Sequence, residues 1–318
     1  GRLQAELGRF EAATTTLASA ERSIAGSGAS DPRHRIELAL TRALLHSAAG
    51  DPAAVRAALE QALPLDAPGD AGMRLTAVLR LRLAYADAQA GEHLRAAQLL
   101  DAADERIATL STPDLLLQGD AAYYRGEVLL ARNDLDGAQQ QLERARALYA
   151  QGRRHDEPGD AQLLTALATV HSRSGRTDAA IALQREVLAI SRRLYPPEHP
   201  TLAGKLGLLA NTLAAIGEWT EAEELSAEAL AMRRKALPAG STRLANSLYN
   251  HAVLLLDSGR ASAALPLLEE AESAAAAAFG PADFRTLLIA SARVYALFDA
   301  GGTSEARALA ARPETALA

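Results

Sequence analysis

Apolar side chains recur along the chain at the three- and four-residue spacing of amphipathic helices, and short polar turns interrupt them at regular intervals. Each turn contains a glycine or an asparagine, the residues that best tolerate the left-handed conformation ending a helix. Successive turn residues lie 42 residues apart, with one interval of 41. The pattern therefore predicts a tandem array of two-helix units with corners at Gly8, Gly50, Gly91, Asn133, Gly175, Gly217, Gly259 and Gly301.

The side chains that flank these turns are small or large in a fixed order. Small residues or valine stand five after and seven before the turn, where two antiparallel helices would cross, and leucines recur nine after it. Because a single hairpin cannot bury its apolar stripe alone, the pattern predicts an all-α superhelical solenoid of about seven to eight stacked repeats. The positions five after the turn are Ala13, Val55, Ala96, Ala138, Ala180, Ala222, Ala264 and Ala306; those seven before it are Ala43, Ala84, Gly126, Ala168, Ala210, Ala252 and Val294; the leucines include Leu17, Leu59, Leu100, Leu142 and Leu268.

Proline, glycine and aspartate gather between the predicted hairpins, where proline stops each second helix. Arginine pairs near the same helix ends are interpreted as solvated cations at the negative pole of the helix dipole, rather than as a nucleic-acid patch. No internal boundary stands out, so residues 1–318 are predicted to form one continuous solenoid, with a first repeat truncated at its N-terminus and a short last hairpin. The linkers are 27–33, 66–72, 111–114, 156–160, 195–201, 237–242 and 279–283, and the pairs are Arg153/Arg154, Arg192/Arg193 and Arg233/Arg234.

Composition narrows the function classes. Hydrophobic residues make up 49% of the 318 residues but aromatic residues only 4%, which favours helices packed through small side chains. The formal net charge of -6 argues against a nucleic-acid partner. The chain has no cysteine, which excludes disulfides and thiolate zinc sites, and no apolar run approaches the roughly 20 residues of a membrane span. We therefore expect a soluble fragment without nucleic-acid or membrane contact.

No pattern of residues indicates catalysis. The seven histidines show neither an H-E-x-x-H arrangement nor four-residue spacing, so a metal site is not expected. The stretch Gly26-Ser27-Gly28 has no strand before it and is read as a linker, and phosphate-binding, hydrolase and kinase signatures are absent. The acidic pairs Glu223/Glu224 and Glu269/Glu270 are interpreted as solvated surface. The sequence predicts a chain without enzyme activity, metal or cofactor.

The first helix of each hairpin is expected to line the concave side of the solenoid, with the residues six, nine, ten and thirteen before the turn pointing into it. Asparagine can donate to and accept from a peptide backbone, although the same residues could instead bond a neighbouring repeat. Tyrosines there would be rigid anchors for a partner, or else part of the core. The candidate binding residues are Arg82, Tyr85, Tyr123, Tyr124, Arg173, Asn211, Asn246, Tyr249, Asn250 and Tyr295.

The hairpins resemble the tetratricopeptide repeat, in the 42-residue variety seen in kinesin light chains and many bacterial regulators. The segments that carry the resemblance are LYPPEHPTLAGKLGLLANTLAAIGEWTEAEELSAEALAMRRKAL (194–237) and SLYNHAVLLLDSGRASAALPLLEEA (247–271). It covers essentially the whole chain, most strongly from about 160 to 280, although Pro52 and Thr177 replace the aromatic residue usual two positions after the turn. The resemblance implies a right-handed superhelix and a peptide-backbone contact for Asn211 and Asn250.

The resemblance also implies a biological setting. Repeats of this Ala-, Leu- and Arg-rich type are similar to the carboxy-terminal sensor or docking halves of bacterial membrane-anchored serine/threonine kinases. The presence of only two lysines, Lys205 and Lys235, fits a high-GC bacterial source. In that setting the fragment would be periplasmic if a transmembrane helix precedes residue 1 in the parent protein, and cytoplasmic otherwise.

Three function hypotheses follow from these features. The first is a non-catalytic regulatory module that binds a protein or an extended peptide in its concave groove. The alternative is a self-association scaffold, a homodimer formed through the truncated first helix or the Ala-rich face of 271–279. A sensor of a small ligand is the third hypothesis and would need a closed pocket between hairpins.

Overall fold

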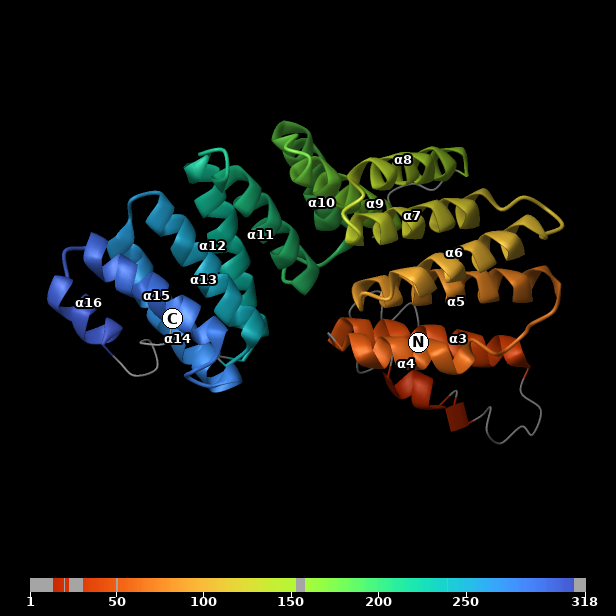
Figure 1. The fold of residues 1–318 in the computed structure, drawn as a ribbon, viewed down its shortest axis with the longest axis horizontal. Coiled ribbons are helices and arrows are strands. Elements are labelled where there is room, and N and C mark those ends of the chain that lie inside the picture. Colours follow the sequence, from red (N-terminus) through yellow and green to blue (C-terminus); the bar gives the residue numbers. More distant parts are fainter. Residues whose placement is uncertain are drawn as a thin grey trace. The chain divides into compact units, whose positions relative to one another are not determined.

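The computed structural model describes residues 14–19, 21–22, 31–49, 51–152, 158–238 and 240–311. All regular secondary structure within these ranges is helical, which confirms the all-α prediction (Figure 1). The helices are α3 (Pro32–Ala49), α4 (Pro52–Ala62), α5 (Gly69–Gln89), α6 (His93–Ala108), α7 (Leu115–Ala131), α8 (Leu135–Gln151), α9 (Pro158–Arg173), α10 (Thr177–Leu194), α11 (Pro200–Ala214), α12 (Trp219–Ala236), α13 (Thr242–Asp257), α14 (Ala261–Phe279), α15 (Phe284–Asp299) and α16 (Thr303–Ala310).

The helices form two compact units, one ending at Gly175 and the other beginning at Arg176. In unit 1, α3, α5 and α7 each pack against their own second helix and against the first helix of the next hairpin. In unit 2, α11, α13 and α15 pair in the same way with α12, α14 and α16, and α13 contacts both α11 and α15. Each unit is therefore a stack of helical hairpins, as predicted. The continuity of the solenoid over residues 1–318 stays a prediction.

The predicted corners have the left-handed backbone that was expected of them. Asn133 has a φ of 63°, and the turn glycines from Gly91 onward have φ values between 74° and 87°. After each turn residue the next amide closes the helix end; the Asp134 N–H, for example, donates to the Leu129 carbonyl at 2.9 Å. The corners at Gly91, Asn133, Gly175, Gly217, Gly259 and Gly301 are confirmed, whereas Gly8 and Gly50 lie outside the described residues.

The small residues predicted at the helix crossings form the centre of each hairpin. The alanines five after the turn, from Ala96 onward, are all 0% exposed, and the leucines nine after the turn are buried against them. The crossing of α7 and α8 is the tightest case, because a Cβ at Gly126 would lie 2.7 Å from Leu142 Cγ. Only glycine fits there, so the small-against-large rule holds even where alanine would be too large.

The helix ends follow the predicted linkers. α10 ends at Leu194, α12 at Ala236 and α14 at Phe279, each shortly before a proline. At helix starts an aspartate often accepts from the first-turn amides, as Asp114 does from the Leu117 N–H at 3.0 Å. The arginine pair 153–154 lies outside the described residues.

The other arginine pairs do more than solvate helix ends, and here the sequence interpretation needs correction. Arg192 on α10 pairs with Glu228 on α12 at 3.1 Å, and Arg234 on α12 pairs with Glu270 on α14 in the same register. Glu223 likewise pairs with Arg260. Arg192 and Arg234 thus join the second helices of successive hairpins, although each exposed pair contributes at most about 1 kcal/mol.

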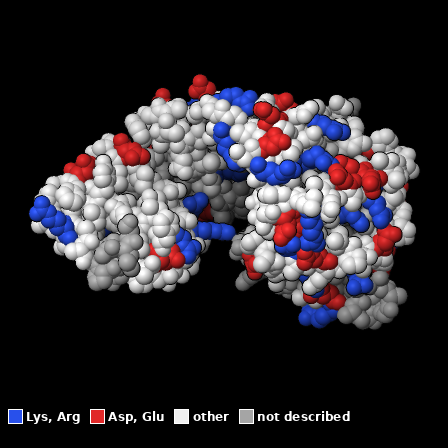
Figure 2. All heavy atoms as spheres, viewed as in Figure 1, with Lys and Arg blue, Asp and Glu red and all other residues white. Residues whose placement is uncertain are grey.

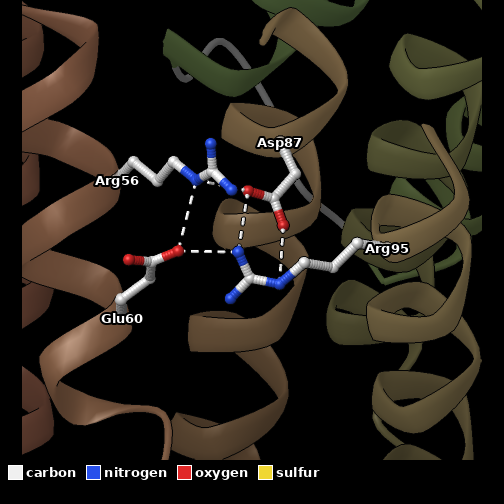
Figure 3. A network of polar contacts seen from close by, with 4 residues as sticks. All are labelled: Arg56, Glu60, Asp87 and Arg95. Atoms are coloured by element: carbon white, nitrogen blue, oxygen red, sulfur yellow. Dashed lines mark hydrogen bonds and ion pairs between the residues drawn. The ribbon is translucent and has the colours of Figure 1, made fainter. Parts of the chain in front are cut away.

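A buried ion-pair network joins α4, α5 and α6 in unit 1 (Figure 3). The Asp87 carboxylate is 0% exposed and lies 2.9 Å from Arg56 Nε and 3.4 Å from Arg95 Nε. Glu60 bridges the same two arginines, at 3.2 Å and 2.6 Å. Burial raises the pKa of Asp87, whereas the guanidinium groups of Arg95 and Arg56 act to lower it. The carboxylate thus depends on both arginines to remain charged in the core.

Replacing Asp87 by alanine should lower the free energy of unfolding by about 2 kcal/mol, because two partly buried guanidinium groups lose one of their two acceptors and keep only Glu60. Urea unfolding followed by far-ultraviolet circular dichroism measures the loss. Asp101→Ala is the matched control, since Asp101 is an exposed aspartate that pairs with Arg125 at 3.0 Å, and it should cost less than about 1 kcal/mol. Equal losses in the two variants would contradict a structural role for the network.

Candidate functional site

Unit 1 contains a hollow of about 130 Å³ in the middle of its first-helix face, here called the Arg82 hollow. Its walls include residues that lie nine, ten and thirteen positions before the turn. The sequence alone could not show that these residues line the same hollow. Its walls come from α5, α7, α8 and α9. They are Val78, Leu81, Arg82, Asp120, Tyr123, Tyr124, Tyr149, Gly159 and Gln162.

One glycine allows this hollow to form. A Cβ at Gly119 on α7 would lie 2.5 Å from Tyr149 Cε1, so only glycine lets the ring of Tyr149 cross α7. Tyr149, on α8, is buried and donates its hydroxyl proton to Asp120 Oδ1 at 2.7 Å. A side chain of a second helix thereby reaches the first-helix face. Sequence reasoning missed Gly119 and Tyr149, because their contact belongs to this repeat alone.

Arg82 lines the hollow together with Asp120, whose Oδ1 accepts from Tyr149, and no ion pair of Arg82 is found among the described residues. Its Nε is buried and has no hydrogen-bond partner among the described residues. By contrast, Arg125, which also lies in unit 1, contacts Asp101 and Asp104 at 3.0 Å and 2.7 Å. A half-buried guanidinium without an acceptor is costly, so the hollow is suited to a ligand group that accepts hydrogen bonds.

Three tyrosines flank Arg82 along α5 and α7. The rings of Tyr85 and Tyr124 have centroids 6.2 Å apart, and Tyr123 meets Tyr124 edge-on at 5.2 Å. Burial, reinforced by the Glu127 carboxylate, raises the pKa of Tyr85 and holds that of Tyr123 well above its usual value. These phenols stay protonated at neutral pH, so the cluster combines flat apolar rings with hydrogen-bond donors.

A second hollow of about 450 Å³, here called the Arg173 hollow, lies nearer the turns on the same helices. Arg173 is held in place by the preceding corner, since its Nη atoms donate to the Leu130 carbonyl at 3.0 Å and to Asn133 Oδ1 at 2.6 Å. Both acceptors are uncharged, so the positive charge of Arg173 is held in position rather than neutralised. The lining consists of Ala88, Gln89, Gly91, His93, Glu127, Leu130, Ala131, Thr169 and Arg173.

The remaining candidates belong to unit 2. Asn211 on α11 and Asn246 and Asn250 on α13 are exposed, and no hydrogen bond of their side chains is found among the described residues. Asn246 and Asn250 stand one turn apart on α13, which contacts α11. Tyr249 is half-buried, whereas Tyr295 on α15 is largely exposed. These asparagines are open to solvent, whereas Arg82, Tyr123, Tyr124 and Arg173 of unit 1 line the two hollows described above.

No cluster of three or more histidine, aspartate or glutamate side chains that could hold a metal ion occurs in the described residues. Within the same residues no helix combines the length and the apolar character needed to cross a membrane. On the face of unit 1 seen at the right of Figure 2, acidic and basic side chains are interspersed and form no patch of one sign.

The family model for the tetratricopeptide repeat matches residues 119–193, 159–235 and 201–277, which together span half of the chain. The chain belongs to the tetratricopeptide repeat family. The match begins in α7 and ends in α14, so it includes the tyrosines of the Arg82 hollow and all three asparagines of unit 2. The family expected from the 42-residue period is thus confirmed. No curated protein matches the sequence.

Solved structures of other tetratricopeptide repeat proteins share the fold. Repeats of a putative kinesin light chain from Podosopora anserina are 23% identical, with a TM-score of 0.54 over 59% of this chain and 90% of that one. The apo form of RapI is 13% identical, with a TM-score of 0.68 over 86% of this chain and 73% of that one. NprR in complex with its cognate peptide NprX is 15% identical, with a TM-score of 0.55 over 88% and 76%.

Gly119→Ala should lower the free energy of unfolding by about 1–3 kcal/mol, because the added methyl group displaces the Tyr149 ring and its bond to Asp120. Thermal unfolding measures the change. Gly204→Ala is the control, since Gly204 lies in α11 with open space at its Cβ, and alanine there should stabilise the helix by about 0.5–1 kcal/mol. A stabilising effect at Gly119 would show that Tyr149 is not held by close packing on α7.

Proposed function

We propose that this tetratricopeptide repeat chain is a non-catalytic regulatory module that binds a protein segment in extended form along its first-helix faces. The observation that carries the proposal is the Arg82 hollow, where a half-buried guanidinium lacks an acceptor and tyrosine rings stand beside it. A bound chain would supply the missing acceptor and cover the rings. A binding role is favoured because arginine and tyrosine are the residue types that most often anchor protein interfaces.

The two hollows of unit 1 suit an extended peptide in size and spacing. A volume of about 130 Å³ accommodates one side chain, since it equals the share of about four liquid waters. Arg82 and Gln89, one in each lining, are seven residues apart on α5, so the hollows are about 10 Å apart along the helix. An extended chain rises about 3.3 Å per residue and its side chains alternate between two sides, so side chains two or four positions apart, about 7 or 13 Å, would face the hollows together.

The asparagines of unit 2 extend the proposal. Asn211, Asn246 and Asn250 are exposed and each offers both a donor and an acceptor, which suits contact with the backbone of a bound chain. Such contacts carry no sequence preference, whereas the Arg82 hollow selects the group that enters it. We propose that unit 2 holds the backbone of a bound chain on its own first-helix face, and that the Arg82 hollow makes unit 1 selective for the side chain it receives.

One of the similar structures supports a peptide as ligand, because NprR was solved in complex with its cognate peptide NprX. By analogy, the module would convert the arrival of a peptide into a changed activity of a larger signalling protein. A serine/threonine kinase as that larger protein stays a prediction.

A displayed library of random octapeptides provides the test. Wild-type protein should retain specific peptides, and Arg82→Met should weaken their binding about 10- to 100-fold, the effect of losing a charge-assisted hydrogen bond. Fluorescence polarisation with the selected peptides measures the affinity. Arg144→Met, on the outer face of α8 and in neither lining, is the matched control and should bind as wild type does.

Two outcomes would count against the proposal. If no peptide is retained by wild-type protein, the peptide-binding function is wrong. If peptides bind but neither Arg82→Met nor Tyr124→Ala affects them, the unit 1 groove is not the site, and Asn211→Ala with Asn250→Ala then tests unit 2.

A further inference from the structure

Helix α15 exposes an apolar stripe that runs along its whole length. Its four large members are Phe284 (76% exposed), Leu288 (44%), Tyr295 (62%) and Phe298 (47%), and Ser291 is exposed at the centre. Together with Ser291, these side chains are spaced four, three, four and three residues apart, which places them on one face of the helix. An uninterrupted apolar stripe on a soluble helix marks a surface that another molecule covers.

Earlier repeats show what kind of element fits this face. On α5 in unit 1, the residues three and ten before the turn are Ala88 and Leu81, both buried, and α5 packs against α7, the first helix of the following repeat. The same two positions on α15 are Phe298 and Ser291, both exposed. The stripe therefore has the location and the character of a helix-docking surface.

The order of side chains makes the stripe complementary to itself. Read from either end it is large, large, small, large, large, with Ser291 and Ala292 at the centre. A second α15 laid antiparallel on the first would bring Leu288 against Tyr295 of the other copy and Phe284 against its Phe298. The small residues would meet at the crossing point, where they let the two helices approach closely. We infer that a second copy of this chain occupies the stripe and forms a two-fold symmetric dimer.

Arg285 stands at the start of α15 and Asp299 at its end, and both are exposed. Arg285 pairs with Asp283 of its own chain at 2.8 Å and stacks on the Phe279 ring. The charge at the start of the helix is therefore already compensated, and the antiparallel orientation rests on the order of the side chains in the stripe.

The small area of the stripe limits the affinity of the dimer. Four partly exposed large side chains offer roughly 450 Å² of surface per copy, and about 900 Å² for the pair, which is below the usual size of a stable interface. We therefore expect a dimer that dissociates in the micromolar range.

The other surfaces considered for self-association fit less well. In the Ala-rich stretch 271–279, Ala271, Ala274 and Ala275 are buried in the core of unit 2 itself, so that face is not free for a second copy. The truncated first helix, Gly1 to Leu7, lies outside the described residues.

Cysteine trapping tests the geometry directly, because the chain contains no cysteine of its own. Ser291→Cys should form a disulfide-linked dimer in mild oxidant, since the two-fold axis passes beside this residue. Mixed Leu288→Cys and Tyr295→Cys proteins should link to each other in preference to themselves, which reports the antiparallel orientation. Ser273→Cys, an exposed serine on α14, is the control and should remain monomeric. Linkage of Ser273→Cys as fast as Ser291→Cys would overturn the inference.

Sedimentation equilibrium tests the same inference without a crosslink. Wild-type protein should associate reversibly with a micromolar Kd, and Phe284→Glu should raise that Kd at least tenfold. The control Leu94→Glu replaces a comparably exposed (78%) leucine on α6 and should leave the Kd unchanged. A wild-type chain that stays monomeric up to several hundred micromolar would overturn the inference and assign the stripe to another occupant. The peptide-binding proposal rests on Arg82 in unit 1 and is decided by its own experiment.

Discussion

The close approach of the two helices in each hairpin is the constraint on which the other features depend. A fully buried alanine five residues after the corner lies at this crossing in repeat after repeat, and at the crossing of α7 and α8 only glycine fits at position 126. Because a small residue recurs at the same position of each crossing, each first helix presents the same register to its neighbours. A given position before the turn therefore faces the same way in every repeat, and a surface can be assembled from one residue per helix.

This constancy explains which features the sequence could predict. The left-handed corners and the crossing alanines repeat every 42 residues, so their positions follow from the register alone. The residues of the Arg82 hollow follow partly, since Tyr123, Tyr124 and Asp120 hold first-helix positions. Tyr149 and the Asp87 network could not be predicted, because each occurs in one repeat and depends on how individual side chains pack. The missed ion pairs are different: Arg192 and Arg234 each meet a glutamate 36 residues later, a spacing visible in the sequence.

The two units stabilise the same architecture by different means. Unit 1 places charge in its interior, where Asp87 needs both of its arginines, and builds its groove around tyrosines. Unit 2 pairs its charges on the outside, between the second helices of successive hairpins, and leaves asparagines on the first-helix face. A buried network tolerates little change, whereas exposed pairs can be replaced at small cost. The chemistry of the groove can therefore differ between the units although the helical scaffold is the same.

Arg82 and the stripe on α15 are surface features of opposite kinds. The Nε of Arg82 is a buried polar atom that has no hydrogen-bond acceptor among the described residues. The α15 stripe, by contrast, is a row of large apolar side chains exposed to water. Neither contributes to the stability of the isolated chain, and each would be relieved by contact with another molecule. A peptide that carries an acceptor would satisfy Arg82, and an apolar helix would cover the stripe on α15. Since the two groups lie in different units, one chain can use its first-helix face for a ligand and its last full hairpin for a second copy.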